Sequence, residues 1–376
     1  MFSLENFYYI LYTNLLRTAN FADCYFFPFG STNVDDLMFG IHEPINSYKD
    51  HCFFYDQEPL NINTVQHCVE KFLPLSPIKN KSIIFATSEH SSLVDEACHA
   101  NGFKKWYYFF HGFAALDWYR DYQYIPIVEN HFTKVFISFN RLVTKDRSYR
   151  LNFVSQLKER DLLKYGSVSL ILKDNGLGTW QEELADPDTR LSASAKELVS
   201  RTLTEIGTGL TIDVDNPPGH ASANAGSAEL NMYRSALWHV VTETVFYDNK
   251  QHLTEKIFKP IVARRPFMLI GAVGNLAYLR GYGFKTFGRW IDESYDNEAD
   301  PDKRIEIIVL ELEKLCQLSM AELEQMHQEM QEILDFNFNH LYGEFKNIIV
   351  DELVDNFKQV SGTQLDLANV KQLLKK

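Results

Sequence analysis

The chain has 376 residues, of which 45% are hydrophobic and 14% aromatic. This composition excludes a disordered or fibrous protein, and the length exceeds the ~250–300 residues at which one core usually stops growing, so we expect two domains. The formal net charge of −13 argues against a protein that coats nucleic acid, but the charge is uneven. The segment 292–355 holds 18 acidic and 4 basic residues, whereas 134–164 holds 8 basic and 3 acidic residues and leaves a polyanionic partner open.

Membrane, export and disulfide signals are missing from the sequence. No run approaches the ~18–20 uninterrupted apolar residues of a membrane span, and the first residues lack a basic lead with a small-residue cleavage site. We therefore expect a cytoplasmic protein without a membrane span. The cysteines are odd in number, widely spaced and free of any CxxC pair, which predicts reduced thiols and no zinc site. They are Cys24, Cys52, Cys68, Cys98 and Cys316.

The first third of the chain alternates short apolar runs with helix-length amphipathic segments, which is typical of β-α units around parallel sheets. We expect one Rossmann-like domain over residues 1–130, with Gly102 ending a helix as its C-cap. The expected strands or strand ends are 23–30, 51–59, 82–88 and 106–112, and the expected helices are 63–73 and 91–102.

The same alternation starts again after residue 130 and predicts a second Rossmann-like domain over 131–303. The polar stretch 172–228 is rich in Asp, Gly, Ser, Thr and Ala and resembles an elaborated loop or insertion. Residues 304–376 carry apolar positions at helical spacing and predict acidic C-terminal helices that pack back on the domains. In the second domain we expect strands at 134–140, 167–172, 236–246 and 266–271, and a helix at 149–163.

Residues 240–271 run as strand, polar loop, helix and strand. Thr254 stands where a helix N-cap belongs, and Glu255 and Lys256 follow in the first turn. A helix N-terminus with a lysine suits a pyrophosphate, and a carboxylate in the same turn can accept the hydroxyls of a ribose. An acidic first turn also occurs simply because it complements the helix dipole. Pro260 predicts a kink in this helix or a shorter helix.

In its spacing, this segment resembles the donor-binding motif of GT-B glycosyltransferases, as in the α1,3-fucosyltransferase and exostosin-like families. The matching residues are Glu243, Thr254 to Phe258, Arg265 to Phe267, and Gly271. The resemblance implies an α/β GT-B fold, two Rossmann-like domains facing across a cleft, with a UDP or GDP sugar as donor. It also implies that Glu255 binds the ribose and Lys256 the diphosphate.

The segment 138–170 resembles the opening of the same domain, where an Asn-Arg pair ends the first strand before a helix. Arg141 and Arg150 thereby become candidate phosphate contacts, because guanidinium groups suit phosphate oxygens. The alternative for both arginines is an ordinary solvated helix face. In such enzymes helix dipoles and basic side chains, rather than a metal, usually serve the leaving group, and Lys256 and Arg150 fit that role here.

Glycosyl transfer also needs a general base for the acceptor hydroxyl. Asp56, Glu58 and His111 stand just past predicted strands of the first domain, where open α/β sheets bind ligands. The two carboxylates can equally cap a turn, and His111 can equally be structural. Asp213 and Asp215 form a DxD pair that suggests a metal-bound sugar diphosphate, but no strongly hydrophobic strand precedes them.

Together these patterns predict a metal-independent glycosyltransferase that moves a sugar from a nucleoside diphosphate to an acceptor hydroxyl, with a glycan as first choice. Similarity of the DQEP and GFKTF segments to bacterial and bacteriophage sequences raises a second acceptor, the hydroxymethylated pyrimidines of phage DNA. The basic segment 134–164 favours that acceptor, although neither a helix-turn-helix nor a zinc finger is visible. A third alternative is a non-catalytic binding protein with the same fold.

Overall fold

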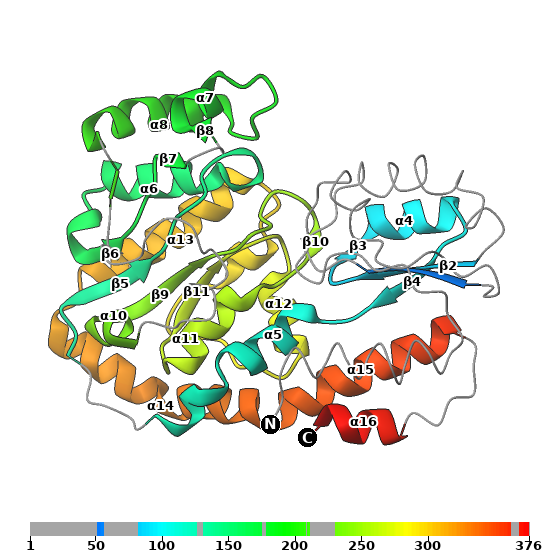
Figure 1. Ribbon diagram of the computed structural model, residues 1–376. Coiled ribbons are helices and arrows are strands. Elements are labelled where there is room, and N and C mark those ends of the chain that lie inside the picture. The colour runs from blue at the N-terminus through cyan, green and yellow to red at the C-terminus, as the bar shows by residue number, and fades with distance from the viewer. Residues whose placement is uncertain are drawn as a thin grey trace. The chain divides into compact units, whose positions relative to one another are not determined.

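The computed structural model describes residues 51–55, 82–125, 131–174, 178–207, 209–210, 230–361 and 368–375. These residues form a mixed α/β protein with parallel sheets (Figure 1), so the predicted fold class is confirmed at that level. The chain divides into two compact units. Unit 1 comprises Met1–Arg120, Lys250–His252 and Tyr342–Lys376, and unit 2 comprises Asp121–Asn249 and Leu253–Leu341.

Unit 1 contains a parallel sheet of order β1-β2-β4 in the part of the chain that is described. Two of its strands match the predicted segments 51–59 and 82–88, and β2 is buried along most of its length. Its elements are β1 (His51–Tyr55), β2 (Ser82–Thr87), β3 (His90–Ser91), α4 (Ser92–Ala100), β4 (Lys104–Tyr107), α5 (Phe110–Trp118), β10 (Lys250–Gln251), α15 (Glu344–Ser361) and α16 (Ala368–Lys375).

Helix α4 begins and ends as its sequence predicts. The Ser91 side chain accepts from the backbone N–H of Val94 and caps the start of the helix. Gly102 takes a φ of 68°, and the N–H groups of Gly102 and Phe103 reach back to carbonyls of the last turn. Only glycine adopts this left-handed conformation cheaply, so Gly102 ends the helix as predicted, one position after the C-cap residue Asn101.

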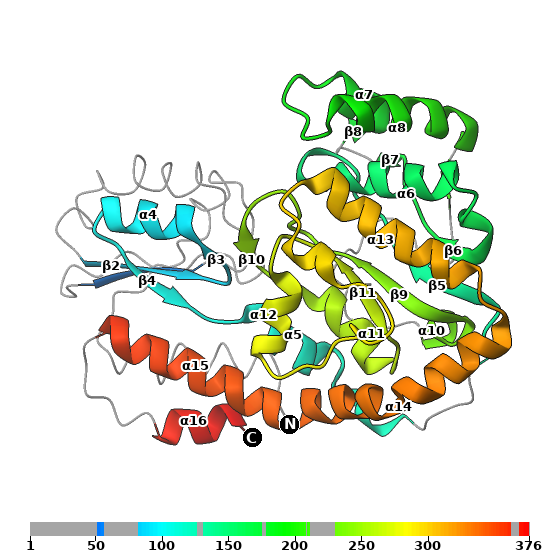
Figure 2. The same cartoon turned by 180° about the vertical axis from the view of Figure 1, so that it is seen from behind.

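Helix α15 covers the sheet of unit 1 along β4. The Trp106 indole N–H donates to the Leu353 carbonyl at 3.1 Å, and its ring meets Phe357 edge to face. Trp106 is fully buried, which fits the large apolar contribution of an aromatic side chain to a core. Figure 2 shows α15 and the shorter α16 together on this unit.

Unit 2 is built around a parallel sheet whose described strands run in the order β11-β9-β5-β6. Every residue of β9 is buried, as expected for a parallel strand covered on both faces. The strands are β5 (Lys134–Ser138), β6 (Gly166–Val168), β9 (Ala236–Thr242) and β11 (Phe267–Ile270), with a small pair, β7 (Lys173–Asp174) and β8 (Gly178–Thr179).

Unit 2 contains both α-helices and short 3-10 turns. The first of these turns, η2, begins at Arg120, the last residue of unit 1 in this part of the chain. The α-helices are α6 (Tyr149–Glu159), α7 (Trp180–Ala185), α8 (Ala193–Ile206), α10 (Leu230–Ser235), α11 (Phe258–Val262), α12 (Asn275–Gly281), α13 (Pro301–Cys316) and α14 (Met320–Tyr342). The 3-10 turns are η2 (Arg120–Tyr124), η3 (Lys145–Arg147), η4 (Leu163–Tyr165), η5 (Glu255–Ile257) and η6 (Ser294–Asn297).

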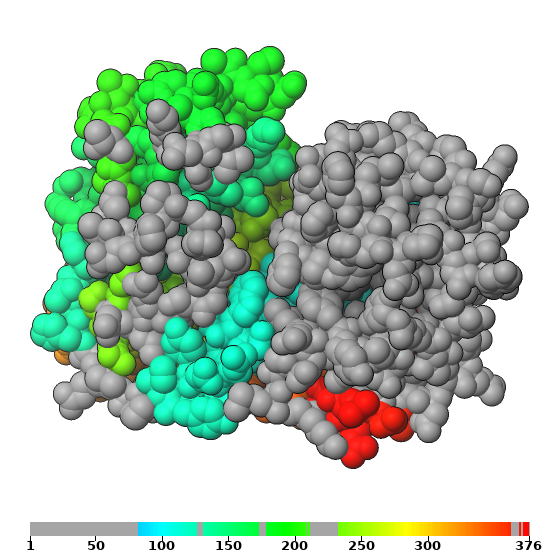
Figure 3. All heavy atoms as spheres, in the orientation of Figure 1, coloured from blue at the N-terminus to red at the C-terminus, as the bar shows by residue number. Residues whose placement is uncertain are grey.

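The polar stretch 172–228 is more regular than a loop. Thr179 and Glu182 form a capping box at the start of α7, and the Ser192 side chain caps α8, which packs against α6. Both helices lie at the surface in Figure 3, which explains their polar composition. Of the two predicted alternatives, the loop is wrong for 180–185 and 193–206, because an exposed helix needs only a narrow apolar stripe; an insertion stays a prediction.

The described C-terminal residues are helical, but their helices do not pack as one group. Helix α13 and nearly all of α14 belong to unit 2, whereas α15 and α16 belong to unit 1. The sequence-based boundaries at residues 130 and 303, taken as limits of independently folding domains, stay predictions. Among the described helices, none is long and apolar enough to cross a membrane.

Candidate functional site

The carboxyl ends of the unit 2 strands meet at one edge of the sheet, because β11, β9, β5 and β6 are all parallel. Open α/β sheets bind ligands at this edge. Polar side chains follow the strands there: Asn140 comes after β5, Ser169 after β6 and Glu243 after β9. The edge thus combines the ends of buried strands with groups that can form hydrogen bonds.

Glu243 is the buried anchor of the site. Its carboxylate accepts hydrogen bonds from the Thr254 hydroxyl at 2.6 Å, the Thr254 N–H at 3.3 Å and the Thr244 N–H at 3.2 Å. The residue is 0% exposed, so these three donors replace water around the carboxylate. Glu243 therefore fixes Thr254 at the end of β9, across the eleven-residue separation between them.

Thr254 begins a helical segment, as its sequence position predicts. Its backbone is extended, with φ −106° and ψ −177°, and its side chain accepts from the Lys256 N–H. The segment that follows is short: the 3-10 turn η5 leads into the five-residue α11. Pro260 lies in the first turn of α11, where a missing N–H costs no helical bond. Of the two alternatives that Pro260 left open, the structure has the shorter helix, and its dipole is correspondingly weak.

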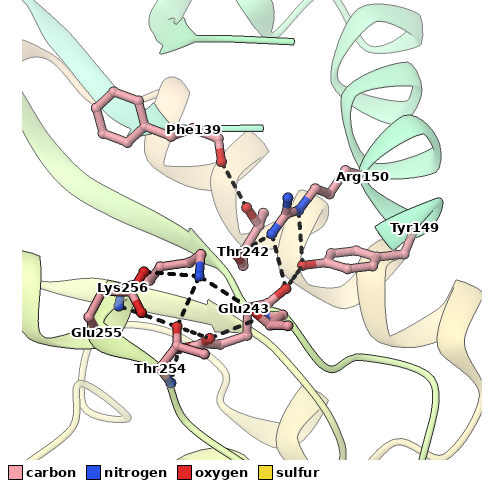
Figure 4. Close-up of polar contacts among 9 residues, drawn as sticks. Phe139, Tyr149, Arg150, Thr242, Glu243, Thr254, Glu255 and Lys256 are labelled. Carbon is pink, nitrogen blue, oxygen red and sulfur yellow. Dashed lines mark hydrogen bonds and ion pairs between the residues drawn. The ribbon is translucent and has the colours of Figure 1, made fainter. Parts of the chain in front are cut away.

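The ammonium group of Lys256 sits among three oxygen atoms (Figure 4). Its Nζ lies 3.2 Å from the Thr244 hydroxyl, 3.1 Å from the Thr254 hydroxyl and 3.2 Å from a Glu255 carboxylate oxygen. The Lys256 side chain is 34% exposed and that of Glu255 is 11% exposed. The cation is thus held in place yet reachable, and two of its three partners are neutral hydroxyls that an anion can displace.

Arg150 lies behind this site and binds backbone carbonyls. Its guanidinium donates to the carbonyls of Leu142, Thr242 and Glu243 at 3.0, 2.9 and 3.1 Å. Tyr149 donates its hydroxyl to the same Glu243 carbonyl, and burial raises the pKa of this hydroxyl, which keeps its proton in place. Arg150 is 3% exposed. Its geometry therefore favours positioning the end of β9 over direct contact with a phosphate.

Arg141, the other predicted phosphate contact, is exposed in the loop after β5. Just before it, the Asn140 amide donates to the Ser138 hydroxyl and the Ser169 carbonyl, which ties the end of β5 to that of β6. The Thr242 hydroxyl likewise donates to the Phe139 carbonyl at 2.9 Å. Sequence reasoning missed Thr242 and Thr244 as site residues because it placed both inside a strand at 236–246, whereas β9 ends at Thr242.

The helix after β11 does not offer an open N-terminus to a ligand. Asp296 accepts from the N–H groups of Leu276 and Ala277 at 2.7 and 2.8 Å, so a carboxylate of the chain itself occupies the first turn of α12. Arg265, part of the sequence motif, stands at the opposite edge of the sheet before β11 and donates to the Tyr233 carbonyl. Its role in the motif is therefore structural.

The predicted acceptor-side and metal residues fall largely outside the described part of the chain. The acceptor-side candidates Asp56 and Glu58 lie outside the described residues, and so do Asp213 and Asp215 of the DxD pair. His111 is described: it stands in the first turn of α5 within unit 1, is 4% exposed, and packs its ring against His252. Among the described residues, no group of three or more His, Cys, Asp and Glu side chains is arranged to hold a metal ion.

The basic segment 134–164 is not an open cationic surface along its whole length. Arg150 is buried and three other basic side chains pair with acidic ones, whereas Arg141 and Lys145 are exposed, so a polyanionic partner stays an open alternative. The pairs are Lys158–Glu205, Arg160–Glu313 and Lys164–Asp161.

No protein-family model matches the sequence, and no curated protein is similar to it. Among solved structures, the chain is similar to a mutant of T4 phage BGT in complex with UDP-glucose. The alignment has 10% identity, covers 83% of this chain and 73% of that one, and gives a TM-score of 0.36. A likeness this distant does not establish a shared fold, so the function has to be inferred from the site itself.

Proposed function

We propose that the protein is a GT-B type glycosyltransferase that binds a nucleoside-diphosphate sugar at the carboxyl edge of the unit 2 sheet. The observation that supports this is the arrangement of Glu243, Thr254 and Lys256, in which a buried carboxylate fixes a threonine that in turn holds a reachable ammonium group. Because the ammonium group is already in position at a ligand-binding edge, the side chains around it need little rearrangement when an anion binds.

In this proposal Lys256 contacts the diphosphate. The two hydroxyl partners of its Nζ are neutral, so phosphate oxygens replace them with a gain in charge–charge attraction. During transfer the diphosphate leaves with additional negative charge, and Lys256 stabilises that charge most when it is greatest. Arg141, exposed after β5, is the candidate for a second phosphate contact, whereas Arg150 positions the end of β9.

Glu255 takes the ribose hydroxyls. Its carboxylate lies beside the Lys256 ammonium and is largely buried. Few water molecules therefore have to leave this carboxylate when a ribose binds to it. The sequence resemblance assigns the same two roles to these residues. A UDP or GDP sugar fits both roles. A glycan hydroxyl is our first choice of acceptor, and a hydroxymethylated pyrimidine of DNA stays the alternative, since Arg141 and Lys145 of the basic segment 134–164 are exposed.

The experiment that tests this function is a screen of UDP and GDP sugars for slow hydrolysis by the full chain in the presence of EDTA. We expect one sugar nucleotide to be hydrolysed, and Lys256→Met to abolish that hydrolysis. The matched control is Lys259→Met, which removes the same charge three residues later in the same segment and should leave hydrolysis unchanged.

Two outcomes would contradict the proposal. If no nucleotide binds and none is hydrolysed, the protein is a non-catalytic module. If EDTA abolishes hydrolysis and Mn²⁺ restores it, the leaving group is served by a metal, and Asp213 and Asp215 become the candidate ligands.

A further inference from the structure

The loop 141–147 follows β5 at the carboxyl edge of the unit 2 sheet, and the stretch 172–228 supplies a residue that holds it. The Glu183 carboxylate on α7 accepts a hydrogen bond from the backbone N–H of Lys145 at 2.7 Å through one oxygen. Its other oxygen accepts from the Thr189 hydroxyl at 2.6 Å. All three residues belong to unit 2, and the proposed function uses none of them.

Glu183 is a buried carboxylate, because only 3% of its surface is exposed. Burial of a carboxylate is costly unless hydrogen bonds replace the water around it, and here a loop N–H and a threonine hydroxyl do so. A hydrogen bond to an ionised acceptor is stronger than one between neutral groups. Helix α7 is therefore firmly connected to the loop at Lys145.

Lys145 has an unusual backbone conformation. Its φ is 54°, in the left-handed region that L side chains rarely adopt. Among the described residues other than glycine, Asp161 and Arg264 also have a positive φ, but each stands just beyond the C-cap of a helix, where this conformation is common. Lys145 instead begins the 3-10 turn η3. Such a conformation persists where the surrounding structure holds it, and it is concentrated at functional sites.

The same loop lies beside the proposed diphosphate site. The Arg150 guanidinium donates to the Leu142 carbonyl at 3.0 Å and to the Glu243 carbonyl at 3.1 Å, so one planar group joins the loop to the end of β9. The hydroxyl of the next residue after Glu243 contacts the Lys256 ammonium. Lys145 follows Leu142 by three residues, which span at most ~11 Å. The two lysines therefore stand in loops that follow the paired parallel strands β5 and β9.

The charges around the loop leave the Lys145 ammonium available to an anion. Lys145 is exposed, and no carboxylate among the described residues pairs with its side chain. The adjacent Asp146 carboxylate lies 3.5 Å from the Arg190 guanidinium, which also pairs with Asp248 at 2.7 Å. These two carboxylates are thus already compensated by an arginine, and an incoming phosphate meets little competition for Lys145.

We propose that Lys145 contacts the diphosphate of the donor together with Lys256, and that Glu183 is the positioning residue that holds Lys145 in place. The inference rests on the proposed glycosyltransferase function. The diphosphate of a sugar nucleotide carries two negative charges, so a single ammonium group compensates only half of its charge. Because Glu183 fixes the backbone of Lys145 in advance, the second cation needs little rearrangement when the donor binds.

Titration calorimetry of the full chain with UDP and with GDP tests the contact. Lys145→Met should weaken binding of the nucleotide that the wild type prefers on the order of 10-fold. Lys145→Arg keeps the charge and should change the Kd by less than about 2-fold. Lys164→Met is the matched control and should bind as wild type, because it removes the same charge from the same basic segment, just before β6 at the amino edge of the sheet.

Glu183 is tested through its coupling to Lys145. Glu183→Leu removes both acceptor oxygens and should weaken nucleotide binding about 5–10-fold, whereas Glu183→Gln keeps an oxygen for the Lys145 N–H and should bind as wild type. The double variant Glu183→Leu/Lys145→Met should lose no more affinity than Lys145→Met alone, since residues that act independently give additive losses. Thr189→Val removes the other hydrogen bond of Glu183 and should leave affinity unchanged.

The outcomes separate this inference from the proposed function. If Lys256→Met loses nucleotide binding and Lys145→Met does not, the inference is wrong and the proposed function stands. Additive losses in the double variant would show that Glu183 acts on the fold and not through Lys145. If Arg141→Met weakens binding and Lys145→Met does not, the second contact belongs to Arg141. If the wild type binds neither UDP nor GDP, the proposed function fails, and this inference fails with it.

Discussion

The carboxyl edges of the two sheets hold their charged groups in opposite ways. At the unit 2 edge, the Lys256 ammonium faces two neutral hydroxyls and one carboxylate, and about a third of its side chain is exposed. At the unit 1 edge, Glu89 and Lys250 compensate each other, and the histidines beside them are buried. The first arrangement suits the binding of an incoming anion, whereas in the second the charges are already compensated within the fold.

The largest expected effect comes from the exposed cation. Lys256→Met should reduce sugar-nucleotide turnover by a factor on the order of 10²–10³, because one preorganised contact to a developing negative charge is removed. Steady-state hydrolysis measures this effect, and the unfolding midpoint checks the fold. A variant that keeps more than a third of the wild-type turnover would remove Lys256 from the mechanism.

The buried anchor can be separated from general core stability. Glu243→Gln turns one acceptor oxygen into a donor that faces the hydrogen-bond donors of Thr254 and Thr244, at a cost of about 1–3 kcal/mol in stability. We expect nucleotide affinity to fall as well. Asp296→Asn is the matched control, because this buried carboxylate also accepts from two backbone N–H groups, at the start of α12.

Denaturant unfolding and titration calorimetry measure the two quantities for both variants. The account predicts a loss of stability in each variant and a loss of affinity in Glu243→Gln alone. Equal losses of affinity would show that Glu243 acts only through the fold.

A smaller effect is expected from Arg150, which positions the end of β9. Arg150→Lys keeps the charge, but an ammonium group cannot donate to all three carbonyls that the planar guanidinium reaches. The end of β9 should therefore become more mobile, and nucleotide affinity should fall by about 5–20-fold, or roughly 1–2 kcal/mol. Arg265→Lys is the control at the amino edge of the same sheet, where a buried arginine also donates to a carbonyl.

We expect both arginine variants to unfold more easily and only Arg150→Lys to bind nucleotide more weakly. Guanidinium ion at low concentration should restore binding to an Arg150→Ala variant. Unchanged affinity in Arg150→Lys would reduce Arg150 to a core residue.

The smallest effect concerns the dependence of stability on pH. Burial lowers the pKa of His239 to about 3 and that of His327 to about 4, and both lie in unit 2. Between these values and about 6.5 the unfolded chain binds more protons than the folded chain, so stability is full above pH 6.5 and falls as the pH drops toward 4.

His239→Phe removes one of these groups and keeps a ring of similar shape in the core. Its free energy of unfolding should depend less steeply on pH between 6.5 and 4, by up to about 1.4 kcal/mol per pH unit. Denaturant titrations at several pH values measure the slope. An unchanged slope would show that His239 is not neutral in the folded chain.

The sequence was informative where structure is determined locally. The strands at 134–140 and 236–246 and the N-cap at Thr254 were predicted because apolar runs and capping residues carry their own signal. The carbonyl partners of Arg150 were beyond reach, because two of them lie over 90 residues away in the chain. Helix α8 was missed because its exposed face is polar.

The buried polar residues at the carboxyl edge of the unit 1 sheet, such as Glu89, Lys250 and His252, show the same limit more sharply. His252 lies in a polar loop between two predicted elements, and no periodicity distinguishes it from its neighbours. Its environment depends on a carbonyl 164 residues earlier and on a ring from α5. Such a cluster becomes visible only when the pairing of β10 with β3 is known.

The central claim is that Thr254, Glu255 and Lys256 hold a nucleoside diphosphate, and the most direct test is calorimetric titration of the full chain with UDP and with GDP. The account predicts binding of one of them at a single site and loss of that binding in Lys256→Met, with Lys259→Met as wild type. Absence of heat with both nucleotides, or equal affinity in wild type and Lys256→Met, would contradict it.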